Sequence, residues 1–294
     1  MNIIRPCMGW MMRRPRKSKK SSSLTGWIPR DFKKVGFMRN QYDNIEKAAA
    51  YDRSVRIWED GKERVAGMAL SSEMKVLDIG CGPGILALPM AKRVQEVTVV
   101  EPSAAMRDLL RKHMKEEGVN NIRILPSLWE EVPEEELEEY DLVIASYSLN
   151  MPDFLEAALK MDRHSRGEVW LYWFAGETSW ERDKRILSAR LGDPTPVSGH
   201  RKIDVFYNIL YNAGIYCDIN MLHGTSFDRE YETFEEAVED HRKRHGLAED
   251  ALPVLTAYLM ERLESRDGTW YYRDLTHYVR MSWRAGQRLQ ERNG

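Results

Sequence analysis

The sequence predicts an α/β fold with a doubly wound, mostly parallel seven-stranded sheet and helices on both faces. Two observations predict this fold. Short apolar runs alternate with amphipathic helical stretches over residues 74–174, as is typical of parallel strands joined by crossover helices. A glycine-rich turn also follows the first apolar run. We expect the last strand to be antiparallel and to follow a helical insertion.

The first five strand candidates are short apolar runs. They are MKVLDIG, EVTVVE, NIRIL, YDLVIAS and GEVWLYWF. The helices predicted between them cover residues 85–93, 103–117 and 153–161, with a short acidic helical stretch near Glu134. Residues 38–69 carry apolar side chains at helical spacing, which predicts helices leading into the sheet.

The regular alternation of predicted strands and helices ends after residue 174. The sequence then predicts helices over 178–191 and 201–213, a strand over 215–222, and helices over 233–245 and 251–263. In the last strand candidate, THYVRMSW, mainly apolar positions alternate with mainly polar ones, which is the period of a strand. We expect it to pair with residues 215–222.

The first 37 residues differ from the rest in charge. They carry ten Lys or Arg and a single acid, Asp31, whereas the whole chain has a net charge of −2. The segment RRPRKSKKSSS has too few apolar side chains to offset the cost of chain ordering. We therefore expect residues 1–37 to be a basic, disordered extension. Met38 opens a stretch typical of a domain start, so translation from Met38 is a hypothesis that intact mass can test.

Cysteine usage and hydropathy argue against secretion and membrane insertion. The three cysteines, Cys7, Cys81 and Cys217, lack the spacing of a zinc site or a redox pair. The apolar stretch at the N-terminus is short and broken by Arg5, and no run approaches the roughly 18 apolar residues of a membrane span. We expect a soluble, cytoplasmic protein.

The glycine-rich turn Asp78-Ile79-Gly80-Cys81-Gly82-Pro83-Gly84 is the most informative motif. Glycines let backbone approach a ligand closely, and the start of the next helix offers unpaired amides. The second strand ends in Glu101, whose carboxylate can accept hydrogen bonds from both hydroxyls of a ribose. A dinucleotide site would need a third glycine at position 85, which is Ile85.

With these motifs, residues 76–148 resemble the class I methyltransferases that use S-adenosylmethionine. VLDIGCGPG and VVEPSAAM match that family's first two motifs. The resemblance implies that Gly80, Cys81 and Gly82 lie against the methionine part of the cofactor. Asp78 would lie near its ammonium group or the ribose, and Glu101 would hold the ribose. Cys81 is then a small residue of the loop rather than a reactive thiol.

The family also places a residue after the third strand against the adenine. The matching stretch is LPSLWEE, so the candidates are Ser127, Leu128 and Trp129, with the indole able to stack and the hydroxyl to hydrogen-bond. The aspartate usual in the family is missing, and Glu130 is a candidate to replace it. The complete set of expected cofactor-binding residues is Asp78, Gly80, Cys81, Gly82, Gly84, Glu101, Pro102, Ser127, Leu128, Trp129 and Ser146.

The resemblance divides the expected methyltransferase domain, residues 38–294, into three parts. Residues 38–70 are the N-terminal helices, and residues 74–174 are the cofactor-binding half. Residues 175–294 are the substrate-side half, with a helical insertion at about 228–268.

The end of the fourth strand, ASYSLNMPD, is where this family usually contacts the methyl acceptor. The Asn/Asp-Pro-Pro-aromatic motif of enzymes that methylate base or glutamine amino groups is absent there. Tyr147 and Ser148 are candidate catalytic residues, although a buried tyrosine held by a hydrogen bond is an equal interpretation of Tyr147. The sequence identifies no general base.

Two other groups of residues favour structural interpretations. The aromatic segments WLYWF, FYNILY and GTWYY are typical of core packing, although such side chains can also line a pocket for a flat or cationic acceptor. His241 and His245 lie one helical turn apart, yet HRKRH is basic and next to Glu239 and Asp240. We therefore expect a solvated helix and no metal site.

These observations predict a methyltransferase that uses S-adenosylmethionine and acts on a small molecule. The alternative is an RNA- or protein-directed methyltransferase, or a cofactor-binding factor, recruited through its basic arm. The rest of the chain lacks a basic stripe, which favours the small molecule. The sequence does not identify the acceptor or the oligomeric state.

Overall fold

A computed structural model of the chain describes residues 44–57, 60–194, 201–222 and 228–287. All of them belong to one compact unit, Met38–Gly294. The expected basic extension, residues 1–37, lies outside the described residues. Within the described part, no helix is both long and apolar enough to cross a membrane.

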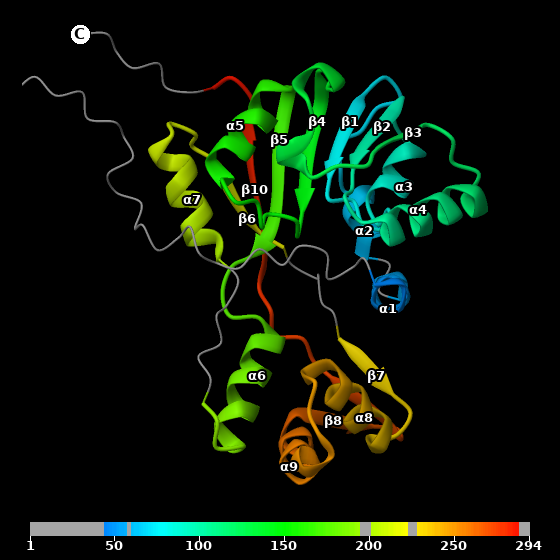
Figure 1. The fold of residues 1–294 in the computed structure, drawn as a ribbon, viewed down its shortest axis with the longest axis vertical. Helices are drawn as coiled ribbons and strands as arrows, with labels where there is room; N and C mark the ends of the chain where they lie inside the picture. The colour runs from blue at the N-terminus through cyan, green and yellow to red at the C-terminus, as the bar shows by residue number, and fades with distance from the viewer. Residues whose placement is uncertain (1–43, 58–59, 195–200, 223–227, 288–294) are drawn as a thin grey trace, which may run out of the picture. The chain divides into compact units, whose positions relative to one another are not determined.

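A seven-stranded sheet in the order β3-β2-β1-β4-β5-β10-β6 forms the centre of the fold (Figure 1). Strands β1 to β5 pair in parallel, and β10 is antiparallel to both β5 and β6. The predicted sheet, its antiparallel last strand and the pairing of that strand with residues 215–222 are therefore confirmed. The strands are β1 (Lys75–Ile79), β2 (Glu96–Val100), β3 (Ile122–Leu125), β4 (Tyr140–Ser146), β5 (Ser165–Phe174), β6 (Asp218–Met221) and β10 (Tyr278–Arg284).

Both faces of the sheet are buried because successive side chains of a strand point to opposite sides. Val76 belongs to one apolar cluster, which packs against the helices α3 (Ala87–Ala91) and α4 (Ala104–Glu117). Its neighbour Leu77 belongs to the other cluster, which packs against α5 (Phe154–Arg163) and α7 (Ile203–Asn212). Continuous apolar runs such as KVLDI follow from this two-sided burial.

Side-chain caps determine where several helices begin. The Ser103 hydroxyl accepts from the amide of Met106 at the start of α4. Thr178 forms a reciprocal capping box with Glu181 at the start of α6 (Ser179–Arg190). Two helices precede the sheet, α1 (Ile45–Ile57) and α2 (Asp60–Ala66), as the spacing over residues 38–69 predicts.

The insertion before the last strand contains more than helices, which corrects the sequence prediction. Besides α8 (Phe234–His245) and α9 (Leu252–Arg262), it holds a small antiparallel sheet in the order β7-β9-β8. The strands are β7 (Arg229–Tyr231), β8 (Leu263–Arg266) and β9 (Thr269–Tyr272). Asp267 and Gly268, with φ of 50° and 83°, form the two-residue hairpin turn between β8 and β9. Asp-Gly is a strong hairpin signal, so the sequence contained this information.

The expectation of a solvated face at the end of α8 is also wrong. His241 is only 2% exposed, and the side chain of His245 is 8% exposed. Both lie beside an apolar cluster formed by α6, α8, α9 and the small sheet. The flanking basic residues are instead solvated or paired with Glu239 and Asp240.

Candidate active site

The turn after β1 has the backbone shape that only glycine adopts without strain. Gly80 and Gly82 have φ of 72° and 55°. A Cβ on Gly80 would lie 2.4 Å from the Cβ of Ser148, so the turn also packs closely against the end of β4. The amide of Gly80 donates to the carbonyl of Val100 on β2, at 2.7 Å. The turn is thus fixed to the carboxyl ends of two neighbouring strands.

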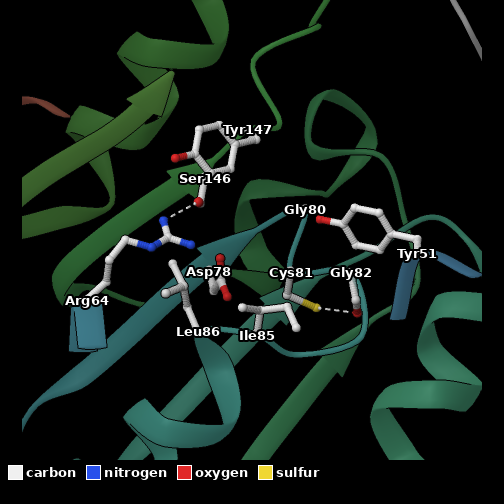
Figure 2. A pocket seen from close by; sticks show the side chains of 10 residues that line it. All are labelled: Tyr51, Arg64, Asp78, Gly80, Cys81, Gly82, Ile85, Leu86, Ser146 and Tyr147. Atoms are coloured by element: carbon white, nitrogen blue, oxygen red, sulfur yellow. Dashed lines mark hydrogen bonds between the residues drawn. The ribbon is translucent and has the colours of Figure 1, made fainter. Parts of the chain in front are cut away.

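A pocket opens beside this turn, at the carboxyl edge of the parallel strands (Figure 2). Ligands of doubly wound sheets bind at this edge, because the strand order reverses there and the loops diverge. Asp78 lies at the centre of the group, with Arg64 and Tyr51 on either side. The lining residues are Tyr51, Arg64, Asp78, Gly80, Cys81, Gly82, Ile85, Leu86, Ser146 and Tyr147.

Two buried carboxyl groups flank the turn. Asp78 is 2% exposed and Glu101 is 6% exposed. Burial raises the pKa of Asp78 to about 7, the positive charge of Arg64 opposes this rise, and Glu101 adds to it. A carboxyl group with a pKa near neutrality gains from a cationic ligand, because a positive charge favours its ionised form.

Glu101 is held in place by backbone donors. The amide of Gly82 donates to its Oε2 at 2.9 Å, and the amide of Ser103 donates to its Oε1 at 2.8 Å. These bonds orient the carboxylate at the end of β2, where the sequence places the ribose contact.

Arg64 is a pocket residue that the sequence analysis missed. Its Nη1 donates to the hydroxyl of Ser146 at 2.9 Å, and its guanidinium lies 5.0 Å from the ring centroid of Tyr172. It supplies a cation to a pocket whose one acidic lining residue, among those that the structure describes, is Asp78. No sequence motif marks a lone arginine in the charged helix α2 as a pocket residue, and none marks Tyr51 on α1.

The three candidates at and just after the end of β4 have different roles. Ser146 lines the pocket and accepts the hydrogen bond from Arg64. Tyr147 lines it too, with a strained φ of 54°, and its ring stacks on Phe174 at 5.2 Å between centroids. Ser148 donates its hydroxyl hydrogen to the carbonyl of Ile79 at 2.5 Å. The Ser148 hydroxyl therefore joins β4 to β1, and Tyr147 is the better placed candidate to meet a substrate.

The residues expected near adenine differ in how exposed they are. Ser127 and Leu128 are half-buried after β3. Trp129 is 3% exposed, its indole N–H donates to the carbonyl of Ala157 at 3.1 Å, and the ammonium of Lys160 lies 4.5 Å from its ring centroid. The Trp129 ring thus packs in the core, and Ser127 and Leu128 offer the more accessible surface.

The remaining predicted residues shape the site rather than line it, apart from Cys81. A Cβ on Gly84 would lie 2.5 Å from Cδ1 of Leu110, so this glycine lets α4 pack against the turn. The carbonyl of Pro102 accepts from Arg107 at 2.6 Å. Burial raises the pKa of Cys81 well above its usual range, which keeps the thiol protonated and unreactive.

The groups in the pocket fit an S-adenosylmethionine molecule. Asp78, which lines the pocket, matches the cationic part of the molecule, and the guanidinium of Arg64 matches its carboxylate. Glu101 is not among the lining residues, but its carboxylate is held beside the turn by the amide of Gly82 and matches the hydroxyl-bearing part. The glycine turn leaves backbone amides and space where a side chain would fill the pocket.

Comparison with known families agrees with this geometry. Residues 76–166 match the family model described as a methyltransferase domain. Residues 76–166 therefore form a methyltransferase domain. The matched segment runs from β1 to the start of β5 and includes Asp78, the glycine turn and Glu101.

Relatives match the chain over parts of their length. An uncharacterised protein of Haemophilus influenzae is 25% identical over 197 residues, which are 65% of this chain and 66% of that protein. A ubiquinone biosynthesis O-methyltransferase of Acinetobacter baumannii is 40% identical over 81 residues, 28% of this chain and 33% of that enzyme. The chain thus spans less than two thirds of these two relatives.

Solved structures share the fold of this chain. The YcgJ protein of Bacillus subtilis has a TM-score of 0.51 and 18% identity, and it covers 80% of this chain and 100% of its own. A putative methyltransferase of Bacillus halodurans has a TM-score of 0.52 and 17% identity, covering 77% of this chain and 98% of its own.

Proposed function

We propose that this protein transfers a methyl group from S-adenosylmethionine to a small-molecule acceptor. The observation that carries the proposal is the pair of buried carboxyl groups, Asp78 and Glu101, on either side of the glycine turn. The family model over residues 76–166 supports the methyl donor. In this proposal Glu101 holds the ribose, Asp78 faces the ammonium group and Arg64 faces the carboxylate of the donor.

The donor carries the methyl group on a sulfonium. A lone pair of the acceptor attacks the methyl carbon in line with the carbon–sulfur bond, that bond breaks, and S-adenosylhomocysteine leaves. The chain's contribution is to position the two reactants and to exclude water. Tyr147, Phe174 and Tyr278 pack as a cluster of rings at the ends of β4, β5 and β10, with centroids 5.2 to 5.8 Å apart. We assign the acceptor side of the pocket to this cluster, next to Tyr147. No residue is assigned as a general base.

The acidic and aromatic side chains in and beside the pocket favour a small, flat acceptor over an RNA. The similarity to an enzyme named for ubiquinone biosynthesis supports this class of acceptor, although it covers 28% of this chain. The alternative acceptor is an RNA or a protein recruited by the basic residues 1–37. A cytoplasmic location stays a prediction from cysteine usage.

A methyl-transfer assay separates the two acceptor classes. The full chain and a chain that begins at Met38 are incubated with donor carrying a labelled methyl group. Each is given separately a metabolite fraction, total RNA and total protein. The proposal predicts label in the metabolite fraction at equal rates for both chains. Label in RNA or protein that is lost on removal of residues 1–37 would support the alternative instead.

A further inference from the structure

A cluster of three potential metal ligands lies far along the chain from the cofactor residues. Asp183 comes from α6, and His241 and His245 come from one face of α8. One ligand atom of each lies within 4.8 Å of the others. It is the one such cluster of three or more ligand side chains found among the described residues.

The imidazole of His241 is buried without hydrogen-bond partners. His241 is 98% buried, and neither of its ring nitrogens has a hydrogen-bond partner within the described ranges. Buried polar atoms are rarely left unpaired, so this imidazole has capacity for a ligand. The ring of His245 lies beside it, with 5.9 Å between the two centroids.

The aspartate accepts hydrogen bonds from two tyrosines. Asp183 is 1% exposed, and its two oxygens accept hydrogen bonds from the hydroxyls of Tyr258 and Tyr272, at 2.5 and 2.6 Å. Nε2 of His245 lies 3.8 Å from Asp183 Oδ2.

We propose that Asp183, His241 and His245 bind a divalent transition-metal ion, with zinc as the best match. Two neutral imidazoles and one carboxylate are a donor set that zinc accepts, and a solvent molecule completes a tetrahedron. Ligand atoms about 2.1 Å from zinc lie roughly 3.4 Å apart, so the side chains close in by about 1 Å on binding.

The surroundings of the cluster match those of a structural metal site. The Tyr258 and Tyr272 hydroxyls orient the carboxylate as outer-shell groups do in metalloproteins. The nearby cations Arg229 and Arg244 are paired with Asp240, at 4.0 and 2.6 Å. The side chain of His245 is 8% exposed, which gives an ion a way in. The ion would join α6 to α8 and stabilise the apolar cluster around Leu187, independently of methyl transfer.

Metal content and cobalt spectroscopy on the full chain test the proposal. Chelator-stripped protein is titrated with zinc chloride, cobalt chloride and magnesium chloride, each alone. We expect one zinc per chain, visible cobalt absorption of a four-coordinate site, a zinc-dependent rise in Tm and no response to magnesium. His241→Gln and His245→Gln should lose the bound ion, whereas His277→Gln, at an exposed histidine just before β10, should keep it.

Tyr272→Phe gives an independent readout that leaves all three ligands in place. Loss of one outer-shell hydrogen bond should weaken zinc binding about tenfold or more. If the histidine variants fail to fold, the wild-type cobalt spectrum and the Tyr272→Phe affinity decide the matter. Stripped wild-type protein that takes up no zinc or cobalt, or an unchanged metal content in a folded His241→Gln variant, would overturn the proposal.

Discussion

The amide of Gly82 donates to Oε2 of Glu101 at 2.9 Å, so the turn after β1 is tied to the end of β2 by the carboxylate assigned to the ribose. One side chain therefore serves two purposes. It fixes the turn in the shape that a cofactor needs, and each of its oxygens keeps a lone pair that can accept a further hydrogen bond.

Replacing Glu101 by Gln tests the ribose assignment. The amide side chain can keep one backbone hydrogen bond but loses the charge that strengthens bonds from hydroxyls. Loss of one or two charge-assisted hydrogen bonds predicts about 10- to 100-fold weaker binding of S-adenosylhomocysteine by calorimetry. Glu96→Gln, at the other end of β2, is the matched control and should bind like the wild type. Equal affinities for the two variants would remove Glu101 from the cofactor site.

Two glycine substitutions separate backbone strain from crowding in the turn. Gly118 has φ of 66°, and a Cβ added there would meet nothing within 4 Å, so Gly118→Ala should lower the free energy of unfolding by about 1 kcal/mol. Gly80 has a similar φ of 72°, but its Cβ would meet Ser148 at 2.4 Å. Gly80→Ala should therefore cost about 2–4 kcal/mol in urea unfolding and abolish cofactor binding. Equal losses of stability would show that the close contact with Ser148 is unimportant.

The raised pKa of Asp78 predicts a pH dependence of stability. Because the folded pKa is about 7 and the ordinary value is 3.8, the folded state binds the proton more tightly. The contribution of Asp78 to the free energy of unfolding is complete below pH 4 and is lost as the pH rises to 7. It amounts to about 4 kcal/mol at most. The difference between wild type and Asp78→Asn in urea unfolding at pH 4.5 to 8 measures it, and a difference that does not change with pH would contradict the assignment.

The same group predicts how cofactor affinity changes with pH. Since a cationic ligand favours ionised Asp78, affinity for S-adenosylmethionine should rise up to about tenfold per pH unit below 7 and level off above it. Asp78→Asn should bind weakly with no such rise. A wild-type affinity that is flat from pH 5.5 to 8 would show that Asp78 does not meet the cationic part of the donor.

Arg64→Met tests the residue assigned to the donor's carboxylate. Methionine keeps much of the apolar stem but removes the cation and its bond to Ser146. We predict about 10- to 100-fold weaker binding of S-adenosylhomocysteine. Any ligand that carries the same carboxylate should also compete less well for the site. Arg53→Met, at an exposed position of α1, serves as the control. Unchanged affinity in Arg64→Met would reject the assignment.

Most of the sheet and of the cofactor loop can be predicted from the sequence because their signals are local. Apolar runs buried on both faces identify the strands, and the positive φ of Gly80 and Gly82 explains why glycine stands there. Asp267-Gly268 also predicts the β8–β9 hairpin, but the hairpin follows residues with strong helical periodicity, which favours a helix.

Residues whose role depends on distant packing could not be predicted in this way. Arg64 reaches Ser146, 82 positions along the chain, and a charged helix gives no sign of it. His241 looks solvated beside its basic neighbours, yet it faces Tyr272 of β9 with ring centroids 4.7 Å apart. Trp129 looks available for stacking, but its indole is held by Ala157. In each case the partner comes from another element of the fold.

The most direct test of the central claim is a thermal-shift and calorimetry panel on the full chain. The ligands are S-adenosylmethionine, S-adenosylhomocysteine and the dinucleotides NAD and NADP, because a ligand that binds only the folded state raises Tm. We predict a rise in Tm and one site per chain for the two methionine nucleotides, with no response to the dinucleotides. No shift and no heat with either methionine nucleotide would contradict the account.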